Sequence, residues 1–429
     1  MRSDDVSNRG TSRRPPQLTR RAFTASLIAS AVGCAPHRPE LDGRASSPNQ
    51  SAVPRRAPPP ATASTGAATA TPDPPARFPV FERFPDLTQS IARVELATLP
   101  TPVQSVPSLG AAIGIPELYI KRDDLTAESY GGGKVRKLEL LLAAASGRGC
   151  RRVVTSGGAG SNHAVATSIY ARRLGLETTL LLLPQAPSRH VRRNLLANHH
   201  HGADLRLLGS QSAVRAITRK MLEARSAASA LYVIAPGGSS PLGNLAYVNA
   251  GLELEAQVRV GLLPAPHRLY VAMGTMGCAV GLAIGLALTD LPTRLIAVRA
   301  SNRPTSTRAR FTALFDATVA WLRQRDPTFP QLRVDPARIT LEGRYLGRGY
   351  AQPTQLGRRA MRMARDHGDL GLDLTYTAKA FAAVSASAAS ARRETVLFWH
   401  THSRTEPSVG AGDPQALPSA FHPYFAGHT

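Results

Sequence analysis

Two lysines follow three consecutive glycines in the stretch YGGGKVRKLE, which runs from Tyr130 to Glu139. Only five of the 52 basic residues are lysines: Lys121, Lys134, Lys137, Lys220 and Lys379. Glycines remove the side chains that would keep a flat ligand away from Lys134. A desolvated lysine amine can form a Schiff base with an aldehyde, which makes Lys134 a candidate for covalent catalysis. The alternative is that both lysines are solvated on one face of a helix start.

Glycines, hydroxyls and amides gather where strands are expected to end and helices to begin. In TSGGAGSNHA (155–164), Ser161, Asn162 and His163 stand at an expected helix start. The free N–H groups and dipole of such a start favour an anion such as a carboxylate. The stretch VAMGTMGCAVG (271–281) has the same character and could cradle a phosphate. The candidate phosphate-binding residues in this stretch are Gly274, Thr275, Gly277 and Cys278. Small residues in such a turn are also compatible with simple close packing of a helix on a strand.

The elements that would position these turns alternate from about residue 78 onward. Seven apolar runs predict buried strands: RRVVTSGG, TTLLLLP, ADLRLL, LYVIAPGG, RLYVAMG, TRLIAVRA and TVLFWHT. Helical spacing follows Asn162 and Gly277. This order indicates an α/β fold with two doubly wound domains and mainly parallel sheets, which bind ligands at the carboxyl ends of their strands. Two domains are expected because single cores seldom exceed about 300 residues.

The net charge of +23 does not by itself indicate a nucleic-acid partner. The arginines are scattered along the chain and no basic motif with interleaved aromatics is present, so we expect no nucleic-acid binding. The run His199 to His201 cannot converge on one metal ion, because consecutive helical residues point about 100° apart. No cysteine or acidic cluster lies at ligand spacing, so no metal is expected. Beyond Cys34, only Cys150 and Cys278 remain, too few for a disulfide framework.

The first 34 residues resemble a bacterial twin-arginine export signal. Arg20 and Arg21 precede a modest apolar run, residues 25–32, which ends at Gly33 and Cys34. The small residues before Cys34 resemble a lipobox, which would leave this cysteine acylated. A disordered basic extension is the alternative.

Residues 35–77 are rich in proline, alanine, serine and threonine and carry few large apolar side chains. Such a segment cannot offset its ordering entropy, so we expect a disordered linker. The protein would then be a periplasmic or cell-envelope lipoprotein that meets the membrane only through its anchor. A cytoplasmic location is the alternative.

The order of motifs in the remaining chain resembles one enzyme family. LPTPVQSV, ELYIKRDDLT, YGGGKVRKLE, TSGGAGSNHA, APGGSSPLGNLAYV, VAMGTMGCAVG, YLGRGYAQPT, GLDLTYTAKA and VLFWHT follow one another between about residues 80 and 403. Together they are similar to the D-cysteine desulfhydrase and 1-aminocyclopropane-1-carboxylate deaminase family of pyridoxal-phosphate enzymes. The resemblance implies a tryptophan-synthase-β-like fold (fold type II), with pyridoxal 5'-phosphate between two domains.

This resemblance also sets the expected organisation of the chain. The catalytic region would span 78–403, and a homodimer is expected. Its smaller domain would cover about 137–245 and its larger domain 78–136 together with 246–403. Residues 404–429 would be a C-terminal tail.

The resemblance implies a role for each matching residue. Lys134 would hold the cofactor as a Schiff base and move the α-proton of an amino-acid substrate, and Lys137 would be a conformational or phosphate-side support. Ser161 would be catalytic and, with Asn162 and His163, would contact the substrate. Asn162 would also contact the cofactor.

The remaining implied roles lie in the second half of the chain. The phosphate loop would comprise Gly274, Thr275, Gly277 and Cys278. Tyr350 and Tyr376 would orient the substrate or assist proton transfer to its leaving group. Thr401 would lie beside the pyridine nitrogen of the cofactor.

Two positions indicate the reaction. A hydroxyl at Thr401, rather than a carboxylate, would leave the pyridine nitrogen largely unprotonated and favour elimination. Thr377 follows Tyr376, as in the desulfhydrase branch, where the deaminase branch carries glutamate. We therefore expect α,β-elimination from a cysteine-like amino acid to pyruvate, ammonia and sulfide.

The chain departs from the family pattern at several positions. These are Gly133 for Asn, Ala159-Gly160 for Val-Gln, Ala246 for Gly, Cys278 for Thr, and His402-Ser403 for Gly-Gly. Two alternatives therefore stay open. One is another pyridoxal-phosphate reaction, such as deamination of 1-aminocyclopropane-1-carboxylate, racemisation or β-replacement. The other is a non-catalytic lipoprotein that binds cofactor or amino acid.

Overall fold

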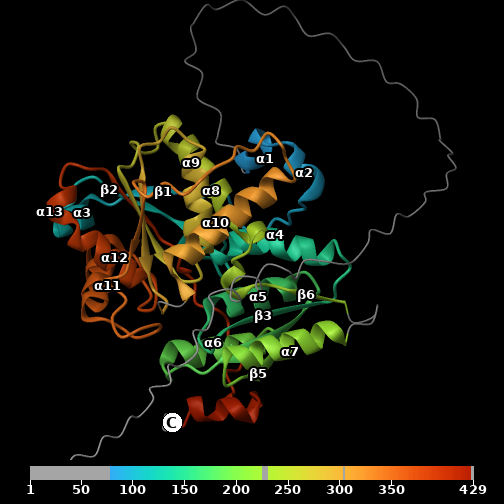
Figure 1. Cartoon of the computed structure of the whole chain (residues 1–429). Coiled ribbons are helices and arrows are strands. Elements are labelled where there is room, and N and C mark those ends of the chain that lie inside the picture. Colours follow the sequence, from blue (N-terminus) through green and yellow to red (C-terminus); the bar gives the residue numbers. More distant parts are fainter. Residues whose placement is uncertain (1–77, 225–229, 303–304, 427–429) are drawn as a thin grey trace, which may run out of the picture. The chain divides into compact units, whose positions relative to one another are not determined.

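The computed structural model describes residues 78–224, 230–302 and 305–426 (Figure 1). All of these residues belong to one compact unit. The predicted export signal, the acylation site at Cys34 and the predicted linker lie outside them and stay predictions. None of the helices in these ranges combines the length with the apolar character that a bilayer crossing requires.

Six strands form the larger sheet, in the order β1-β2-β10-β7-β8-β9. Their bounds are β1 Val103–Ser105, β2 Leu118–Lys121, β7 Arg268–Met273, β8 Arg294–Arg299, β9 Ile339–Glu342 and β10 Val396–Trp399. All neighbouring strands are parallel except β1 and β2. Strand β10 is last in the chain but lies between β2 and β7, with Trp399 opposite Lys121 and Val271. The loop after β10 therefore leaves the sheet beside loops that begin far earlier in the chain.

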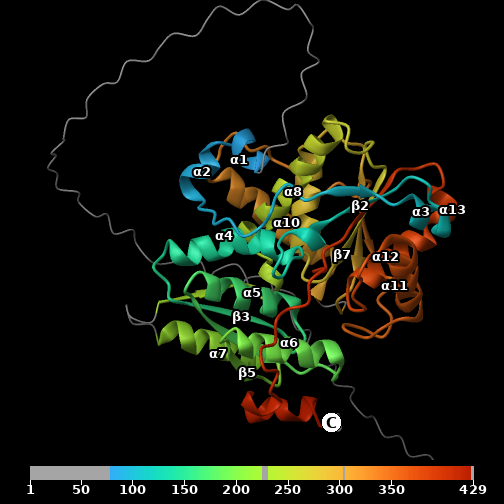
Figure 2. The same cartoon turned by 180° about the vertical axis from the view of Figure 1, so that it is seen from behind.

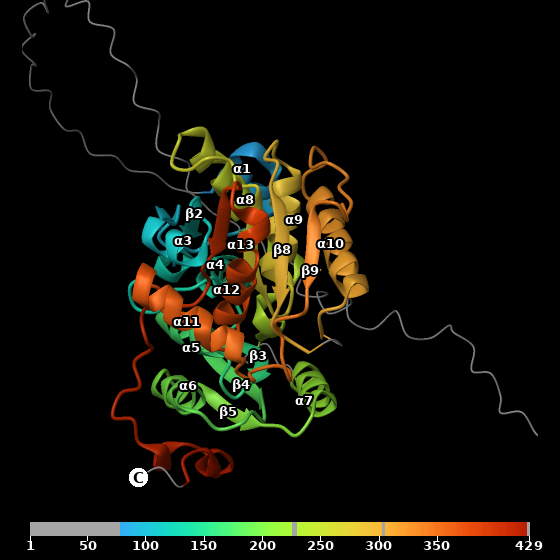
Figure 3. The ribbon, with the colours of Figure 1, turned by 90° about the vertical axis from the view of Figure 1, so that its left-hand side faces the viewer.

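Four parallel strands form the smaller sheet, in the order β5-β4-β3-β6. Their bounds are β3 Arg152–Gly158, β4 Glu177–Leu183, β5 Asp204–Leu207 and β6 Leu231–Val233. Neighbouring residues of β4 point to opposite faces, as strand geometry requires. Leu180 and Leu182 pack with Val191 of helix α6 (Arg189–His200), whereas Leu181 packs with Val214 of helix α7 (Gln211–Glu223). Figure 3 shows α6 and α7 on the two sides of this sheet.

Helices connect the strands and cover both sheets. The α-helices are α1 Pro79–Arg83, α2 Asp86–Ser90, α3 Pro107–Ile113, α4 Lys134–Ser146, α5 Asn162–Arg173, α6 Arg189–His200, α7 Gln211–Glu223, α8 Pro241–Arg259, α9 Gly277–Ala287, α10 Arg308–Arg323, α11 Gln355–Gly368, α12 Thr377–Ala386 and α13 Ala388–Ala391. Short 3₁₀ helices are η1 Asp123–Leu125, η3 Pro236–Gly238, η5 Pro414–Ala416 and η6 Ser419–Tyr424.

The larger sheet has a helical layer on each face (Figure 3). Leu269 and Val271 of β7 pack in the core that contains α8, α9 and α10. Tyr270 between them packs in the other core, with α3, α11 and α12. Because both faces are covered, β10 is apolar throughout and β7 is apolar after Arg268, rather than alternating with polar residues.

The C-terminal segment, which the structure describes from residue 404 to residue 426, packs on the smaller sheet's side of the protein (Figure 2). Leu417, Phe421 and Tyr424 join the apolar cluster that contains Leu182 and Leu195. The backbone N–H of Gln185 donates to the Tyr424 hydroxyl at 3.2 Å. This segment thus adds apolar cover over α6.

The sequence predicted the fold class correctly, an α/β arrangement with mainly parallel sheets. The seven apolar runs form β3 to β8 and β10, and helices begin where predicted, at Asn162 and Gly277. The sequence did not indicate β1, β2 or β9, which have three or four residues each. The residue limits of the smaller and larger domains stay predictions.

Candidate functional site

The turn that carries Lys134 packs against the chain as it leaves β10. Lys134 is the first residue of α4. The Gly133 N–H donates to the Thr401 carbonyl at 3.0 Å, and the Gly131 N–H donates to Ser403 Oγ at 2.9 Å. Two segments that lie about 270 residues apart in sequence are thereby joined at the expected position of the site.

Two of the glycines before Lys134 are needed for different reasons. Gly132 has a left-handed φ of 92°, which favours glycine. Gly133 has an ordinary φ of −63°, but a Cβ atom there would lie 2.0 Å from the Tyr247 hydroxyl. It would also lie 3.3 Å from Cβ of Thr401. Where the family pattern has asparagine, this chain has glycine, and the Tyr247 hydroxyl occupies the space that a side chain at residue 133 would need.

The glycine-rich turn after β7 forms the N-terminus of α9. The Gly277 N–H donates to Ser239 Oγ at 3.1 Å, and Ser239 Oγ lies 2.7 Å from Thr275 Oγ1. Met276 has a left-handed φ of 72°, so the chain bends sharply here without a glycine. The turn gathers two hydroxyls at the start of an eleven-residue helix.

Lys137 reaches this turn from α4. Its Nζ donates to the Gly237 carbonyl at 3.2 Å. A Cβ atom at Gly277 would lie 2.6 Å from Lys137 Nζ, so the two groups face one another closely. Burial lowers the pKa of Lys137 to about 8; the Cys278 thiol opposes this, and the Lys134 charge adds to it. Lys134, Lys137 and Cys278 are therefore neighbours.

These groups fit a phosphate. The free N–H groups and dipole of a helix N-terminus attract an anion. The Ser239 and Thr275 hydroxyls and the Lys137 ammonium add donors at the same place. Ser239 Oγ and Lys137 Nζ can approach the Gly277 backbone this closely only because that residue has no Cβ atom. The chain thus presents a donor set in which pyridoxal phosphate could place its phosphate group.

Ser161 caps helix α5 after β3, as the sequence predicted. Its Oγ accepts the Ala164 N–H at 3.2 Å, and Asn162 Oδ1 accepts from Asn194 at 3.1 Å. His163 Nε2 lies 3.1 Å from Thr155 Oγ1, whereas its buried Nδ1 has no partner among the described residues. Burial, and then the Lys134 and Lys137 charges, hold the pKa of His163 well below its usual range. A neutral His163 therefore lies near both lysines.

Tyr350 and Tyr376 form a pair that contacts both sheets. The Tyr376 hydroxyl donates to the Tyr350 hydroxyl at 3.0 Å. A Cβ atom at Gly274, after β7, would lie 3.0 Å from the Tyr376 ring, and one at Gly158, the end of β3, 3.3 Å from the Tyr350 ring. Burial raises the pKa of both phenols, that of Tyr376 well above its usual range. Both are protonated at neutral pH and lie at the carboxyl ends of two sheets.

Thr401, His402 and Ser403 follow β10 at the lysine turn. Ser403 Oγ accepts from Gly131 and donates to the Thr405 carbonyl at 2.8 Å, so this departure from Gly-Gly is used in packing. Burial lowers the pKa of His402, and the Asp373 carboxylate opposes this shift. Its buried Nδ1 has no partner among the described residues.

A buried ionic network beneath the lysine turn was not predicted from the sequence. Arg136, between the two lysines, donates to Asp123 at 2.8 Å and to Glu253 at 2.8 Å. Lys121 Nζ donates to Glu253 at 2.5 Å, and Tyr247 donates to Asp123 at 2.9 Å. Although burial opposes it, the charges of Arg136 and Lys121 lower the pKa of Glu253 to about 2. The network fixes α4 to β2 and α8. The charges within LYIKRDD and GLELEA, inside otherwise buried elements, were the available signal.

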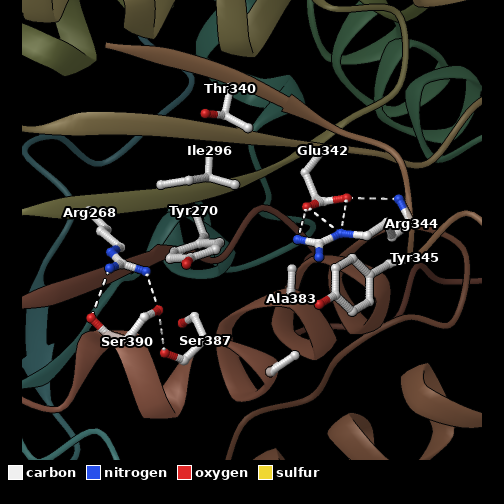
Figure 4. A pocket seen from close by; sticks show the side chains of 11 residues that line it. Arg268, Tyr270, Ile296, Thr340, Glu342, Arg344, Tyr345, Ala383, Ser387 and Ser390 are labelled. Atoms are coloured by element: carbon white, nitrogen blue, oxygen red, sulfur yellow. Dashed lines mark hydrogen bonds and ion pairs between the residues drawn. The ribbon is translucent and has the colours of Figure 1, made fainter. Parts of the chain in front are cut away.

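Figure 4 shows a cavity of about 320 Å³ that lies elsewhere. It is lined by β7, β8, β9 and the end of α12, including Tyr270, Glu342 and Ala386. Ala386 is ten residues beyond Tyr376, which corresponds to about 15 Å along a helix. Arg268 and Arg344 at its margins are already paired, with Glu394 and Glu342. The cavity does not contain any predicted site residue.

The three histidines at 199–201 lie at the end of α6 and just after it. Within the described ranges, no group of three or more histidine, cysteine or acidic side chains is arranged to hold a metal ion.

The structure thus brings together most of the predicted residues. Contacts or electrostatic coupling connect Lys134, Lys137, Cys278, Gly277 and His163. Thr401 contacts Gly133, the residue before Lys134. The tyrosine pair contacts the glycines after β7 and at the end of β3, and no hydrogen bond links it to Lys134 within the described residues.

Known proteins match this arrangement over most of the chain. The family model described as "Pyridoxal-phosphate dependent enzyme" matches residues 94–402. Nocardicin C-9' epimerase of Nocardia uniformis subsp. tsuyamanensis is 34% identical over 321 residues, covering 74% of this chain and 94% of that protein. D-cysteine desulfhydrase of Salmonella newport is 33% identical over 322 residues, covering 72% and 93%.

A solved structure of an ACC deaminase homologue superposes with a TM-score of 0.65 at 28% identity, covering 76% of this chain and 95% of that one. The matched region contains both lysines, the two glycine-rich turns, the tyrosine pair and Thr401. The chain therefore belongs to the pyridoxal-phosphate-dependent enzymes, in the family of D-cysteine desulfhydrase and 1-aminocyclopropane-1-carboxylate deaminase.

Proposed function

We propose that the protein catalyses α,β-elimination from a cysteine-like amino acid, releasing pyruvate, ammonia and sulfide. The observation that carries this proposal is the hydrogen-bonded pair of protonated phenols, Tyr376 and Tyr350, at the ends of β7 and β3. A departing sulfur atom needs a proton, and a phenol held in the neutral form can supply one.

The chain's residues divide the reaction between them. When bound, pyridoxal phosphate supplies the electron sink for chemistry at the α-carbon. Lys137, Ser239 and Thr275 hold the phosphate, and the N-terminus of α5 at Ser161 binds the substrate carboxylate. Lys134 takes the α-proton. The resulting electron pair forms the Cα–Cβ double bond as the C–S bond breaks, and the aminoacrylate released gains water to give pyruvate and ammonia.

Tyr350 is the direct proton donor in this scheme. The Tyr376 hydroxyl already donates to Tyr350, so the Tyr350 proton is the one left for the leaving sulfur. Thr377 cannot act as the deaminase-type glutamate does, because it is buried and its hydroxyl donates to Asp373 at 2.7 Å. The contact of Tyr376 with Tyr350 and the contact of Thr377 with Asp373 therefore favour elimination over ring opening of 1-aminocyclopropane-1-carboxylate.

Epimerisation is the second candidate, because a relative with 34% identity is named for it. It would use the same removal of the α-proton by Lys134, followed by return of a proton to the other face. Burial raises the pKa of Tyr350, which keeps that phenol protonated and able to donate to carbon.

The test uses the full chain loaded with pyridoxal phosphate and given D-cysteine or L-cysteine in D₂O. Release of pyruvate and sulfide supports elimination. Deuterated amino acid of inverted configuration without keto acid would support epimerisation instead. A cofactor spectrum that amino acids do not change would indicate a binding protein and contradict both.

We also propose that the enzyme is exported and anchored through Cys34, and that it is a homodimer. Replacing Arg20 and Arg21 by lysine should keep it in the cytoplasm, and Cys34→Ser should release it from the membrane fraction. Light scattering of the purified protein measures its assembly.

A further inference from the structure

Lys379 is a buried lysine to which the proposed chemistry assigns no role. It lies in the first turn of α12 and is fully buried. Its Nζ donates to the Leu346 carbonyl at 2.9 Å and to the Gly349 carbonyl at 3.0 Å. Burial lowers its pKa to about 8, and the Asp373 carboxylate opposes this shift. An ammonium in such a place is costly, so its two carbonyl partners matter.

Lys379 holds the loop that contains Leu346 and Gly349, and this loop leads directly into Tyr350. The carbonyl of the Gly349–Tyr350 peptide accepts from Lys379, and the N–H of the same peptide donates to Asn302 Oδ1 at 2.9 Å. This peptide group is therefore held at both ends by side chains from other elements. The loop's own bonds are longer, such as Gln352 N–H to the Gly349 carbonyl at 3.4 Å.

The loop would not take this shape without support. Ala351 has a left-handed φ of 57°, and Gly349 has a φ of 145°. A left-handed alanine is unfavourable and persists where surrounding contacts determine it. A compact ammonium can donate to two converging carbonyls, whereas the planar guanidinium of arginine presents its donors in a fixed fork.

Helix α12 also positions the second phenol. Tyr376 precedes the helix as its N-cap residue, and Asp373 accepts the Tyr376 N–H at 2.9 Å and the Thr377 N–H at 2.9 Å. Tyr376 and Lys379 are three residues apart, which places them on one side of the helix. One helical turn thus holds Tyr376 directly and Tyr350 through Lys379.

We propose that Lys379 is a positioning residue. Its hydrogen bonds to the Gly349 and Leu346 carbonyls place the Tyr350 phenol at hydrogen-bonding distance from Tyr376. The role of Lys379 in turnover rests on the proposed function, because it acts only through Tyr350. The placement of Tyr350 itself does not depend on any substrate.

The test therefore begins with a measurement that needs no substrate. In the holoenzyme labelled with [¹³Cζ]tyrosine, the Tyr350 signal is identified by its loss in Tyr350→Phe. Tyr376→Phe removes the donor and defines the shift of an unpaired Tyr350. Lys379→Met should move the Tyr350 signal in the same direction. Lys220→Met, which changes an exposed lysine of α7, should leave it in place. An unmoved signal in Lys379→Met overturns the proposal.

The kinetics of the same holoenzymes provide a second test of the proposal. Lys379→Met should lower kcat at least tenfold with the cofactor spectrum kept, and should have no further effect in the Tyr350→Phe background. Equal losses in both backgrounds would mean a general structural role and would overturn the proposal. Lys379→Gln, which can still donate to one carbonyl, serves if the methionine variant does not fold, and should shift the signal partway. A shifted Tyr350 signal in a protein that never releases pyruvate would refute the proposed elimination while supporting the positioning role.

Discussion

Adding a side chain at Gly133 should destabilise the protein because of one neighbouring atom. The Gly133 backbone has a φ of −63° and a ψ of −3°, which any residue adopts, so alanine is not strained by the chain itself. Its Cβ atom would, however, lie 2.0 Å from the Tyr247 hydroxyl oxygen and 3.2 Å from the Tyr247 ring carbon that bears it. Nearly all of the clash is therefore with the hydroxyl group.

The size of the effect follows from these distances. Overpacking of a closed site costs about 1–3 kcal/mol. Gly133→Ala should fall in this range in the natural background. Tyr247→Phe alone should cost about 1.5–3 kcal/mol, because it removes a hydrogen bond to the buried Asp123 carboxylate. In the double variant the Cβ atom meets only carbon atoms, the Tyr247 ring carbon at 3.2 Å and Cβ of Thr401 at 3.3 Å, so adding alanine should cost less than about 1 kcal/mol.

Urea denaturation of the four proteins measures this coupling. We expect the double variant to be more stable than the sum of the single changes predicts, by about 1–2 kcal/mol, with unchanged m-values. Equal costs of Gly133→Ala in both backgrounds would refute the argument and would mean that another contact limits the turn. Gly133→Asn, which restores the residue of the family pattern, should behave in the same way.

Four further predictions concern separate parts of the site and its cover. Lys134→Ala should abolish the visible band of covalently held cofactor without unfolding the protein, and an undiminished band would point to Lys137 instead. Because the lowered pKa of Lys137 is about 8, its charge is present below pH 8 and lost above it. The dissociation constant for inorganic phosphate should therefore rise above pH 8, and Lys137→Met should remove that rise in calorimetric titrations. Thr401→Asp should increase racemisation relative to elimination if the nitrogen contact is right, whereas an unchanged product ratio counts against it. Phe421→Ala should lower the free energy of unfolding by about 3–5 kcal/mol, because Phe421 is fully buried in the apolar cluster over α6; a loss below about 1 kcal/mol would show that the segment is dispensable.

Local patterns in the sequence were sufficient for the longer elements and for the turns. The apolar runs identified seven strands because buried parallel strands are continuously hydrophobic. Helix starts were visible at Ser161 and at Gly277, where small and polar residues follow a strand. These turns lie at carboxyl ends of strands, so locating them also located much of the candidate site.

Long-range pairing could not be predicted from such patterns. Strand β10 enters between β2 and β7, which brings Thr401 to Gly133, and no local signal specifies that neighbour. Strand β2 was hidden because Lys121 breaks its apolar run, and this lysine is buried only because Glu253 lies opposite it. The packing of Phe421 depends equally on a distant surface that α6 provides.

The scarcity of lysine gains a physical meaning from the structure. Lys134 begins the helix at the lysine turn, Lys137 faces Gly277 at the start of α9, Lys121 closes the buried ionic network, and Lys379 holds the Tyr350 loop. Only Lys220, of the five, is exposed on a helix surface. In a chain that otherwise uses arginine for its positive charge, lysine is found where a compact ammonium meets converging oxygens, or where an amine must give up its proton. Arginine cannot do the second, because its guanidinium stays protonated. Four of the five lysines therefore lie in the candidate site or in the contacts that support it.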